Sequence, residues 1–348
     1  MRSGYFKQTF EELIVLTDSP TVKAWTALLV LALLVAPLVV GSYMLSHMTV
    51  ILYTLVGVLG LTILTGFTGL ISLGHVAFMM IGAYAYAIAI TRFGWTPLPA
   101  MLLAGIVPAV FGLVVGLPSL RLQGLYLAIT TLAFSYIINA IVLSGGKFTG
   151  ASRGISLVRP VIFGLDLNVD RNFYWFCLAI ATIVLLATLN LRRSYIGRAL
   201  VAIRDNDIAA RTMGINLWRY KLLAFVLSAF ITGIAGSLMG MYINYVTVEG
   251  FPFLISIEAL AIIIVGGIGS VLGAVLGTVF IVSLPDVISA VLGVFGAQTN
   301  DLLTRMAFEV KSALYGLAII AFLRFDPRGL RGIWHDLRHA WVHWPQRF

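Results

Sequence analysis

Charged residues are scarce in this chain of 348 residues: they make up 11% of it, whereas hydrophobic residues make up 60%. Soluble globular domains carry about 25% charged residues, so an ordinary soluble fold is excluded. Long apolar runs with little charge indicate an all-α polytopic membrane protein, because helices satisfy their own backbone hydrogen bonds in lipid.

Cysteine is almost absent as well, since Cys177 is the one cysteine and falls within an apolar run. A single cysteine excludes a disulfide framework and a cysteine-based metal site. The GxxxxGK[ST] loop of ATP-hydrolysing proteins is also missing, and no nucleophile, base and acid converge in the sequence. We therefore expect a chain that is not an enzyme and binds no cofactor or metal of its own.

The formal net charge of +9 is concentrated in loops and tail rather than in a soluble basic domain. Membrane topology and anionic lipid explain this distribution better than nucleic acid does. Glu11, Glu12 and Asp18 precede the first apolar run, which is unlike a cleavable signal peptide, so the first span is expected to be retained.

About ten apolar runs approach the roughly 20 residues that a membrane-spanning helix needs. They occupy residues 25–45, 49–65, 70–90, 98–117, 122–143, 172–191, 220–242, 254–265, 271–292 and 306–323. Split after the fifth run, the chain would form two five-span halves that enter from opposite sides, as inverted repeats do. The glycine-broken stretch at 266–273 is either a crossing or a re-entrant segment.

An Arg-rich loop at residues 192–219 sets the orientation, because loops of this kind stay on the cytoplasmic side. Both termini are then cytoplasmic. We divide the chain into an N-terminal segment (1–23), a transmembrane domain (24–323) and a basic amphipathic tail (324–348). The first segment is either an interfacial helix or a frayed end, and the tail is either an interfacial helix or disordered.

The same loop carries signals for a short capped helix. Asp205 or Asn206 suits the N-cap, Asp207 and Arg211 are four residues apart with the acid first, and Gly214 suits the C′ position. A structured helix favours a docking surface for a cytosolic partner, and the alternative is a solvated loop that only obeys the charge rule.

Two polar stripes follow helical spacing inside the apolar runs. The first comprises Ser72, His75, Met79, Gly82 and Tyr86, and the second comprises Thr131, Ser135 and Asn139. Such stripes line a translocation path or supply hydrogen bonds between helices. His75 has no second histidine or cysteine at ligand spacing, so it does not indicate a metal site.

Single acidic residues and glycines complete the set of candidates. Glu258 is the carboxylate deepest within an apolar run, and it is either functional or placed near the outer interface. Asp286, Glu309 and Lys311 border the last runs and are expected to pair with one another. Glycines four residues apart predict close helix packing; they are Gly112 and Gly116, Gly236 and Gly240, and Gly269, Gly273 and Gly277.

Four segments together resemble the permease subunits of branched-chain amino acid ABC importers, specifically the LivM-like subunit. They read GLISLGHVAF at 69–78, RLQGLYLAITTLAF at 121–134, GRALVAIRDNDIAARTMGIN at 197–216, and SIE at 256–258 leading into GGIGS at 266–270. They occur in the expected order along most of the chain, and the third is the most specific.

The resemblance implies a fold like that of the larger, ten-span ABC importer permeases, in the bacterial inner membrane. It implies as partners a second permease subunit, two cytosolic ATPases that hold ATP and Mg, and a periplasmic solute-binding protein. It also identifies the Arg-rich loop as the element that couples to an ATPase. The coupling residues it implies are Arg198, Arg204, Asp205, Asn206, Asp207, Ala209, Ala210, Arg211, Met213 and Gly214.

The substrate expected from this resemblance is a branched-chain or related amino acid. Related permeases carry urea, short amides or aromatic acids with similar motifs, so these remain alternatives. From another class, an ion-coupled secondary transporter would need carboxylates within the membrane, for which Glu258 is the one candidate.

Overall fold

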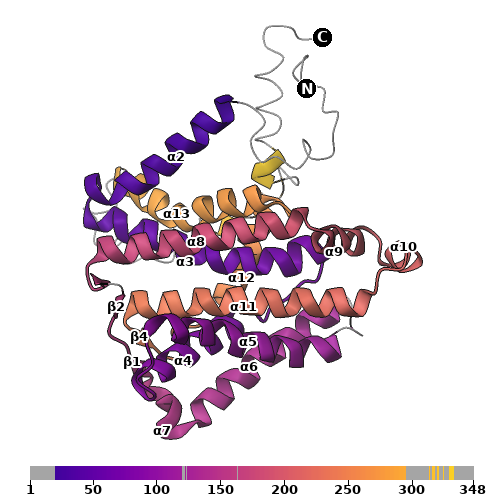
Figure 1. The fold of residues 1–348 in the computed structure, drawn as a ribbon, viewed down its shortest axis with the longest axis horizontal. Coiled ribbons are helices and arrows are strands. Elements are labelled where there is room, and N and C mark those ends of the chain that lie inside the picture. The colour runs from indigo at the N-terminus through magenta and orange to yellow at the C-terminus, as the bar shows by residue number, and fades with distance from the viewer. Residues whose placement is uncertain are drawn as a thin grey trace.

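The computed structural model describes residues 20–119, 122, 124–162 and 164–294, and in the C-terminal part residues 313, 316, 317, 320, 324 and 329–332. Long apolar helices lie side by side, with α9 and α10 at one end of the bundle and short strands at the other (Figure 1). We call these the module end and the strand end.

The long helices run between the two ends. They are α2 (Pro20–Val39), α3 (Ser42–Leu61), α4 (His75–Thr91), α5 (Pro97–Ser119), α6 (Leu125–Ser144), α8 (Asp170–Arg193), α11 (Leu217–Ile243), α12 (Leu254–Gly266) and α13 (Val271–Val294). Among the residues that the structure describes, six helices are long and apolar enough to cross a membrane, and α2, α4 and α12 supply shorter apolar helices. The expected all-α polytopic architecture is therefore confirmed in its coarse form. The tenth predicted run, 306–323, lies mostly outside the described residues, so the count of ten and the inverted halves stay predictions.

The boundary between the first two predicted runs was placed too late in the chain. α2 ends at Val39 and α3 begins at Ser42, with Gly41 in an extended conformation between them. Ser46 and His47 fall between the two predicted runs, but they lie within α3, where His47 pairs with residues of α13. A polar residue whose side chain bonds to a neighbouring helix does not interrupt a membrane helix.

The third predicted run, 70–90, is helical only from His75 onward. α3 continues into a π-helix, η1 (Thr62–Phe67), and residues 69–74 then run in an irregular conformation to the start of α4. Leu70 and Ser72 are buried there. Irregular backbone of this kind is tolerated at membrane depth only where the protein itself surrounds it.

α11 lies at the centre of the bundle and packs against α3, α4 and α5. Gly82 of α4 faces the backbone of Gly233, and Gly236 faces the backbone of Met79, so a side chain at either position would collide with the neighbouring helix. Small residues allow this close approach. The packing role predicted for four glycines, Gly236 among them, is confirmed, because each faces atoms of another element: Gly112, Gly116, Gly236 and Gly240.

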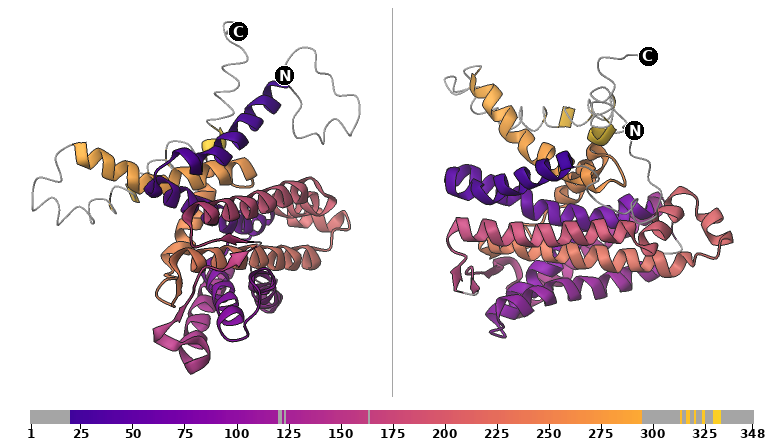
Figure 2. Two further views of the ribbon diagram at one scale, coloured as in Figure 1. Left: turned by 60° about the vertical axis from the view of Figure 1, so that its left-hand side comes forward. Right: turned by 45° about the horizontal axis from the view of Figure 1, so that its top comes forward.

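α12 and α13 form a tight helical hairpin on the same side of the bundle as α2, away from α5 and α6 (Figure 2). α12 has 13 residues, which rise about 20 Å and fall short of a bilayer's hydrocarbon core of about 30 Å. Gly273 and Gly277 pack against α12 as predicted, whereas Gly269 lies in the turn at a φ of 78°. The turn needs this left-handed conformation, so the helix-packing prediction for Gly269 was wrong.

The strand end is closed by two small antiparallel sheets. β1 (Ile155–Ser156) pairs with β4 (Tyr245–Val246), and β2 (Val161–Ile162) pairs with β3 (Leu165–Asp166). A short helix, α7 (Gly146–Thr149), and a 3₁₀ turn, η2 (Ala151–Arg153), precede them. The β1–β4 pairing joins the long loop before α8 to the end of α11.

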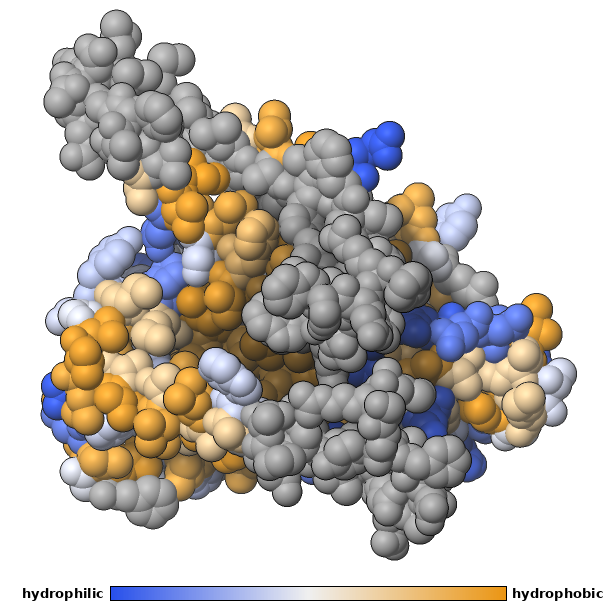
Figure 3. Space-filling model, turned by 90° about the horizontal axis from the view of Figure 1, so that it is seen from above, coloured by the Kyte–Doolittle hydropathy of each residue, from blue (hydrophilic) through white to orange (hydrophobic). Residues whose placement is uncertain are grey.

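Large apolar side chains cover the middle of the surface, as expected for contact with lipid. Figure 3 shows hydrophobic residues over much of the middle of one face, with hydrophilic residues gathered at the right-hand end, which carries α9 and α10. The exposed apolar residues come from several helices; they include Leu31, Leu102, Val110, Ile129, Ile137 and Ile183.

Candidate functional site

The Arg-rich loop folds into two consecutive helices, which we call the loop module (residues 194–216). The first helix, α9 (Tyr195–Asp205), begins at Ser194, whose side chain accepts a hydrogen bond from the backbone N–H of Gly197. Its apolar residues Leu200 and Ile203 are buried against the bundle. This helix was not predicted from the sequence, although a serine N-cap and the apolar spacing were available as signals.

The second helix, α10 (Asp207–Thr212), is the short capped helix that the sequence predicts. Asn206 is its N-cap and accepts a hydrogen bond of 3.0 Å from the backbone N–H of Ala209. Gly214 has a φ of 83°, its N–H donates to the carbonyl of Arg211, and the N–H of Ile215 donates to the carbonyl of Ala210. These two bonds form a Schellman motif, so the predicted C′ role of Gly214 is confirmed.

α10 projects beyond the ends of α8 and α11 (Figure 1). Two apolar residues on it are open to solvent: Ile208 is 74% exposed and Met213 is 83% exposed. Among the other predicted coupling residues, Arg198, Ala209 and Arg211 are exposed, Asp207 lies in the first turn of α10, and Ala210 is buried. The arrangement gives a projecting, capped helix with an apolar surface of its own.

Arg204 joins the loop module to the interior of the bundle. Its Nη1 donates a hydrogen bond of 2.9 Å to the carbonyl oxygen of Gly66 in η1. Its Nε and Nη2 donate to Oδ1 of Asp205 at 3.2 and 3.1 Å. Gly69 and Gly269 leave space for the same side chain, because a Cβ at either position would contact Arg204.

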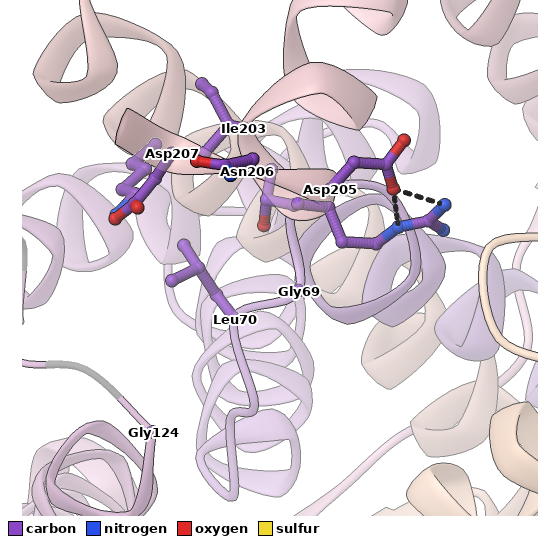
Figure 4. Close-up of a pocket in the computed structure, with 10 residues that line it drawn as sticks. Gly69, Leu70, Gly124, Ile203, Asp205, Asn206 and Asp207 are labelled. Atoms are coloured by element: carbon purple, nitrogen blue, oxygen red, sulfur yellow. Dashed lines mark hydrogen bonds and ion pairs between the residues drawn. The ribbon is translucent and has the colours of Figure 1, made fainter. Parts of the chain in front are cut away.

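A cavity of about 400 Å³ lies beside Arg204. It is lined by residues 68–70, by Gly124 before α6, by residues 203–207 and by Lys221 of α11. In Figure 4 the side chain of Leu70 points toward the turn that carries Asn206 and Asp207, and Gly124 lies apart from them. The loop module therefore meets the interrupted region between α3 and α4 across a partly open space.

The start of α4 is held by hydroxyl groups from three parts of the chain. The N–H of Leu73 donates to Oγ1 of Thr131 at 2.9 Å, and the N–H of Val76 donates to Oγ of Ser256 at 3.0 Å. The hydroxyl of Ser72 accepts from the N–H of Gly74. The first and third of these bonds satisfy N–H groups of the irregular segment, and the bond to Ser256 satisfies one of the N-terminal donors of α4.

The first polar stripe is therefore divided between two structures. Ser72 belongs to the irregular segment, so the predicted single helical face is correct only from His75 onward. His75, Met79 and Tyr86 are all buried, and Nδ1 of His75 lies 3.5 Å from Oγ1 of Thr232 in α11. The contacts are those of helix packing, and a role of these residues in a translocation path stays a prediction.

The second stripe faces the irregular segment. Thr131 and Ser135 are buried, and Asn139 is half-buried farther along α6. Glu258 is half-buried on α12, and it makes no hydrogen bond or ion pair with another residue that the structure describes. Their part in a path likewise stays a prediction.

One polar cluster was not predicted. Nδ1 of His47 in α3 lies 2.8 Å from Oδ2 of Asp286 in α13, and Nε2 lies 3.0 Å from Oγ of Ser283. The hydroxyl of Tyr43 donates to Oδ1 of Asp286 at 3.2 Å. Asp286 was expected to pair with Glu309 or Lys311, which lie outside the described residues. Among the described residues Asp286 pairs with His47, far away in the sequence, and the expected pairing stays a prediction.

Comparison with known proteins gives a consistent set of relatives. The family model for the permease component of branched-chain amino acid transport systems matches residues 43–323. The high-affinity branched-chain amino acid permease protein LivM of Salmonella typhimurium is 37% identical over 269 residues, which are 70% of this chain and 62% of that relative. This match spans less than two thirds of the relative's length.

Two further relatives extend the comparison. LivM of Escherichia coli is 36% identical over 76% of this chain and 68% of its own length. The permease protein BraD of Pseudomonas aeruginosa is 30% identical over 80% of this chain and 91% of its own length. No solved structure matches the chain.

Proposed function

The chain belongs to the family of permease components of branched-chain amino acid transport systems, and we propose that it is the membrane-spanning permease subunit of an ATP-driven importer. Its substrate is a branched-chain or related amino acid, the class for which the three relatives are named. Its partners are a second permease subunit, two cytosolic ATPases and a periplasmic solute-binding protein. The module end faces the cytosol of a bacterium, as do both termini.

The loop module is the observation that carries this proposal. A permease without its own phosphate-binding loop needs a surface through which an ATPase can act. α10 supplies one, because it is capped at both ends, projects from the bundle and exposes Ile208 and Met213. Apolar residues on a projecting helix, rimmed by charges such as Arg211, are suited to a groove in a partner.

Transport follows if the ATPases move the loop module as a rigid body. Closure of two ATPases on ATP would displace α9 and α10 and bias the permease between inward-open and outward-open states. The residues proposed to lie along the path are Ser72, His75, Met79, Tyr86, Thr131, Ser135, Asn139 and Glu258. Substrate selection is assigned mainly to the solute-binding protein.

Docking of an ATPase on α10 is tested by purifying the complex from the wild type and from a variant with an added charge on α10. Ile208→Glu should abolish ATPase retention in mild detergent, because it places a carboxylate in an apolar contact. Val158→Glu at the strand end is the matched control, since Val158 is also 74% exposed. Equal retention of an ATPase by both variants, or by neither, would contradict the docking site.

The substrate class and the energy source are tested in vesicles that contain the purified complex. Leucine uptake should require the binding protein and ATP, and urea, short amides and aromatic acids should compete weakly. Uptake by the permease alone along a proton or sodium gradient would favour the ion-coupled alternative. If the protein is an ion-coupled transporter, Glu258→Gln should abolish uptake. If it is an ATP-driven importer, the same variant should still take up leucine in an ATP-dependent way.

A further inference from the structure

We propose that Arg204 is the positioning residue that transmits movement of the loop module to two interruptions in the membrane helices. These interruptions are residues 66–74, between α3 and α4, and residues 267–270, between α12 and α13. The proposal rests on the proposed function, since it assigns the route by which an ATPase bound at α10 acts on the membrane helices.

The hydrogen bond from Arg204 reaches a carbonyl that the helix itself leaves available. The chain departs from η1 after Thr68, and the N–H groups of Gly69 and Leu70 donate to the carbonyls of Thr65 and Leu64. The carbonyl of Gly66 accepts from Nη1 of Arg204 instead. The guanidinium therefore completes the end of η1, and a hydrogen bond from a charged donor is stronger than a neutral one.

Both interruptions are shaped around this one side chain. Gly69 and Gly269 have φ values of 73° and 78°, and a Cβ built on either would contact Arg204. The Gly69 Cβ would lie 3.0 Å from Cγ of Arg204, and the Gly269 Cβ would contact Nη1. Two turns that are far apart in the sequence thus lie against the same arginine side chain, Gly69 against its aliphatic part and Gly269 against its guanidinium.

Because of the cavity beside Arg204, the contacts of this side chain matter for transmitting movement from the loop module to the membrane helices. An open space of about 400 Å³ lies among residues 203–207, residues 68–70 and Gly124 before α6, so these segments pack against one another only in part, at contacts such as that of Gly69 with Arg204. Arg204 crosses this region, and Asp205 holds its guanidinium in place through Nε and Nη2. A displacement of α9 then pulls on Gly66 and presses on Gly269.

The first interruption in turn positions the start of α4. Residues 69–74 lead directly into α4. Thr131 accepts from the N–H of Leu73 within this segment, and Ser256 accepts from the N–H of Val76 in the first turn of α4. A shift of the segment would strain or release these bonds. Arg204 thus connects the cytosolic helix to the contacts that α4 makes with α6 and α12, and the coupling passes through a hydrogen bond that a substitution can remove.

Hydrogen–deuterium exchange of the complete importer, with and without a non-hydrolysable ATP analogue, separates docking from transmission. In the wild type the analogue should change exchange at 207–214, which reports docking, and at 66–74 and 267–270, which report transmission. Arg204→Ala should keep the first change and lose the other two. Leucine uptake should fall about tenfold while ATP hydrolysis persists, because one charged hydrogen bond is lost.

Three further variants make the test specific. Arg219→Ala, which removes an exposed arginine from the same region, should behave like the wild type. Arg204→Lys keeps the charge but not the guanidinium fork and should restore little coupling. Gly269→Ala should reproduce the loss while Arg204 keeps its charge, because the added methyl group occupies the position of Nη1.

The outcomes distinguish the two proposals. If the analogue leaves exchange at 207–214 unchanged in the wild type, the docking site is wrong and the transmission route falls with it. If docking persists and Arg204→Ala retains the changes at 66–74 and 267–270, the route through Arg204 is overturned while the proposed function stands. A variant that loses the ATPase altogether would make Arg204 a docking residue and would also overturn transmission.

Discussion

Nδ1 of His47 lies 2.8 Å from Oδ2 of Asp286, and this pair joins α3 to α13 near the strand end. A carboxylate only accepts, so Nδ1 donates to it, and Nε2 shares a hydrogen bond with the hydroxyl of Ser283. Asp286 uses its second oxygen to accept from Tyr43. One carboxylate thereby holds two positions of α3 against a single turn of α13.

Removal of this carboxylate should loosen the contact between α3 and α13. We expect Asp286→Asn to lower the free energy of unfolding by about 1 kcal/mol, a small value because Asp286 is 40% exposed and water screens the pair. Thermal unfolding in detergent measures the change. Ser46→Ala alters a half-buried neighbour of His47 as the control, and equal stability of both variants would show that the pair contributes nothing.

The hydrogen bond that Thr131 accepts just before α4 gives a prediction with an adjacent control. Thr131→Val keeps the shape of the side chain but leaves the N–H of Leu73 unpaired, which should cost about 1–3 kcal/mol. Thr130→Val should be nearly neutral, because Thr130 is half-exposed and bonds only to its own helix through the carbonyl of Tyr126. Thermal unfolding of the two variants compares them directly.

Leucine uptake by the same two variants tests whether the second polar stripe, which contains Thr131, only packs helices together or lines the translocation path. If Thr131 only packs, loss of uptake should follow loss of folded protein. Unchanged stability with a large loss of leucine uptake would instead place the hydroxyl of Thr131 on the translocation path and contradict a purely structural role.

The elements that could be predicted from the sequence are those whose signals lie within a few neighbouring residues. The caps of α10 depend on Asn206 and Gly214, two residue types whose backbone and side-chain preferences act within a few positions. Gly214 was identified correctly, and Asn206 was one of the two N-cap candidates. The apolar runs likewise located most helices, because hydropathy depends on composition within a short window.

Features that depend on distant contacts were missed for a physical reason. The interruption at 69–74 is stable because Thr131 and Ser256 satisfy its N–H groups, and nothing local in the segment reveals those partners. His47 pairs with Asp286, which lies 239 positions later in the sequence (286 − 47). Arg204 was predicted as a coupling residue, but its acceptor, Gly66, is a backbone carbonyl that no side-chain pattern marks.

Gly214 offers a test of the cap that leaves no steric ambiguity. A Cβ at Gly214 would meet no atom within 4 Å, so Gly214→Val acts only through the left-handed backbone conformation. That conformation costs about 1–2 kcal/mol for a residue with a side chain, and α10 should unwind from its C-terminal end. We expect lower ATPase retention and faster hydrogen exchange at 207–215, with normal membrane insertion.

Gly94 provides a matched control at the strand end. It also has a positive φ, 62°, and open space around its Cβ position. Gly94→Val should impose a similar backbone strain without altering ATPase retention. Normal retention and normal uptake in Gly214→Val would contradict the placement of the coupling helix at α10.

Arg159 should be the strongest single anchor of the strand end. It is 8% exposed, and its Nε and Nη2 donate to the carbonyls of Met241 and Tyr242 at the end of α11. Its Nη1 donates to Asp170 at the start of α8, and its guanidinium lies 4.6 Å from the ring centroid of Phe173. Lysine cannot reproduce this planar set of contacts, so Arg159→Lys should lower the free energy of unfolding by about 2–3 kcal/mol.

Limited proteolysis of the loop before α8, together with thermal unfolding, measures this effect. Arg159→Lys should accelerate cleavage between residues 150 and 170, because the loop loses its attachment to both α8 and α11. Arg153→Lys is the control, since Arg153 is exposed and the hydroxyl of Tyr245 bonds only to its backbone carbonyl. Equal cleavage rates in the two variants would show that the β1–β4 pairing holds the loop without Arg159.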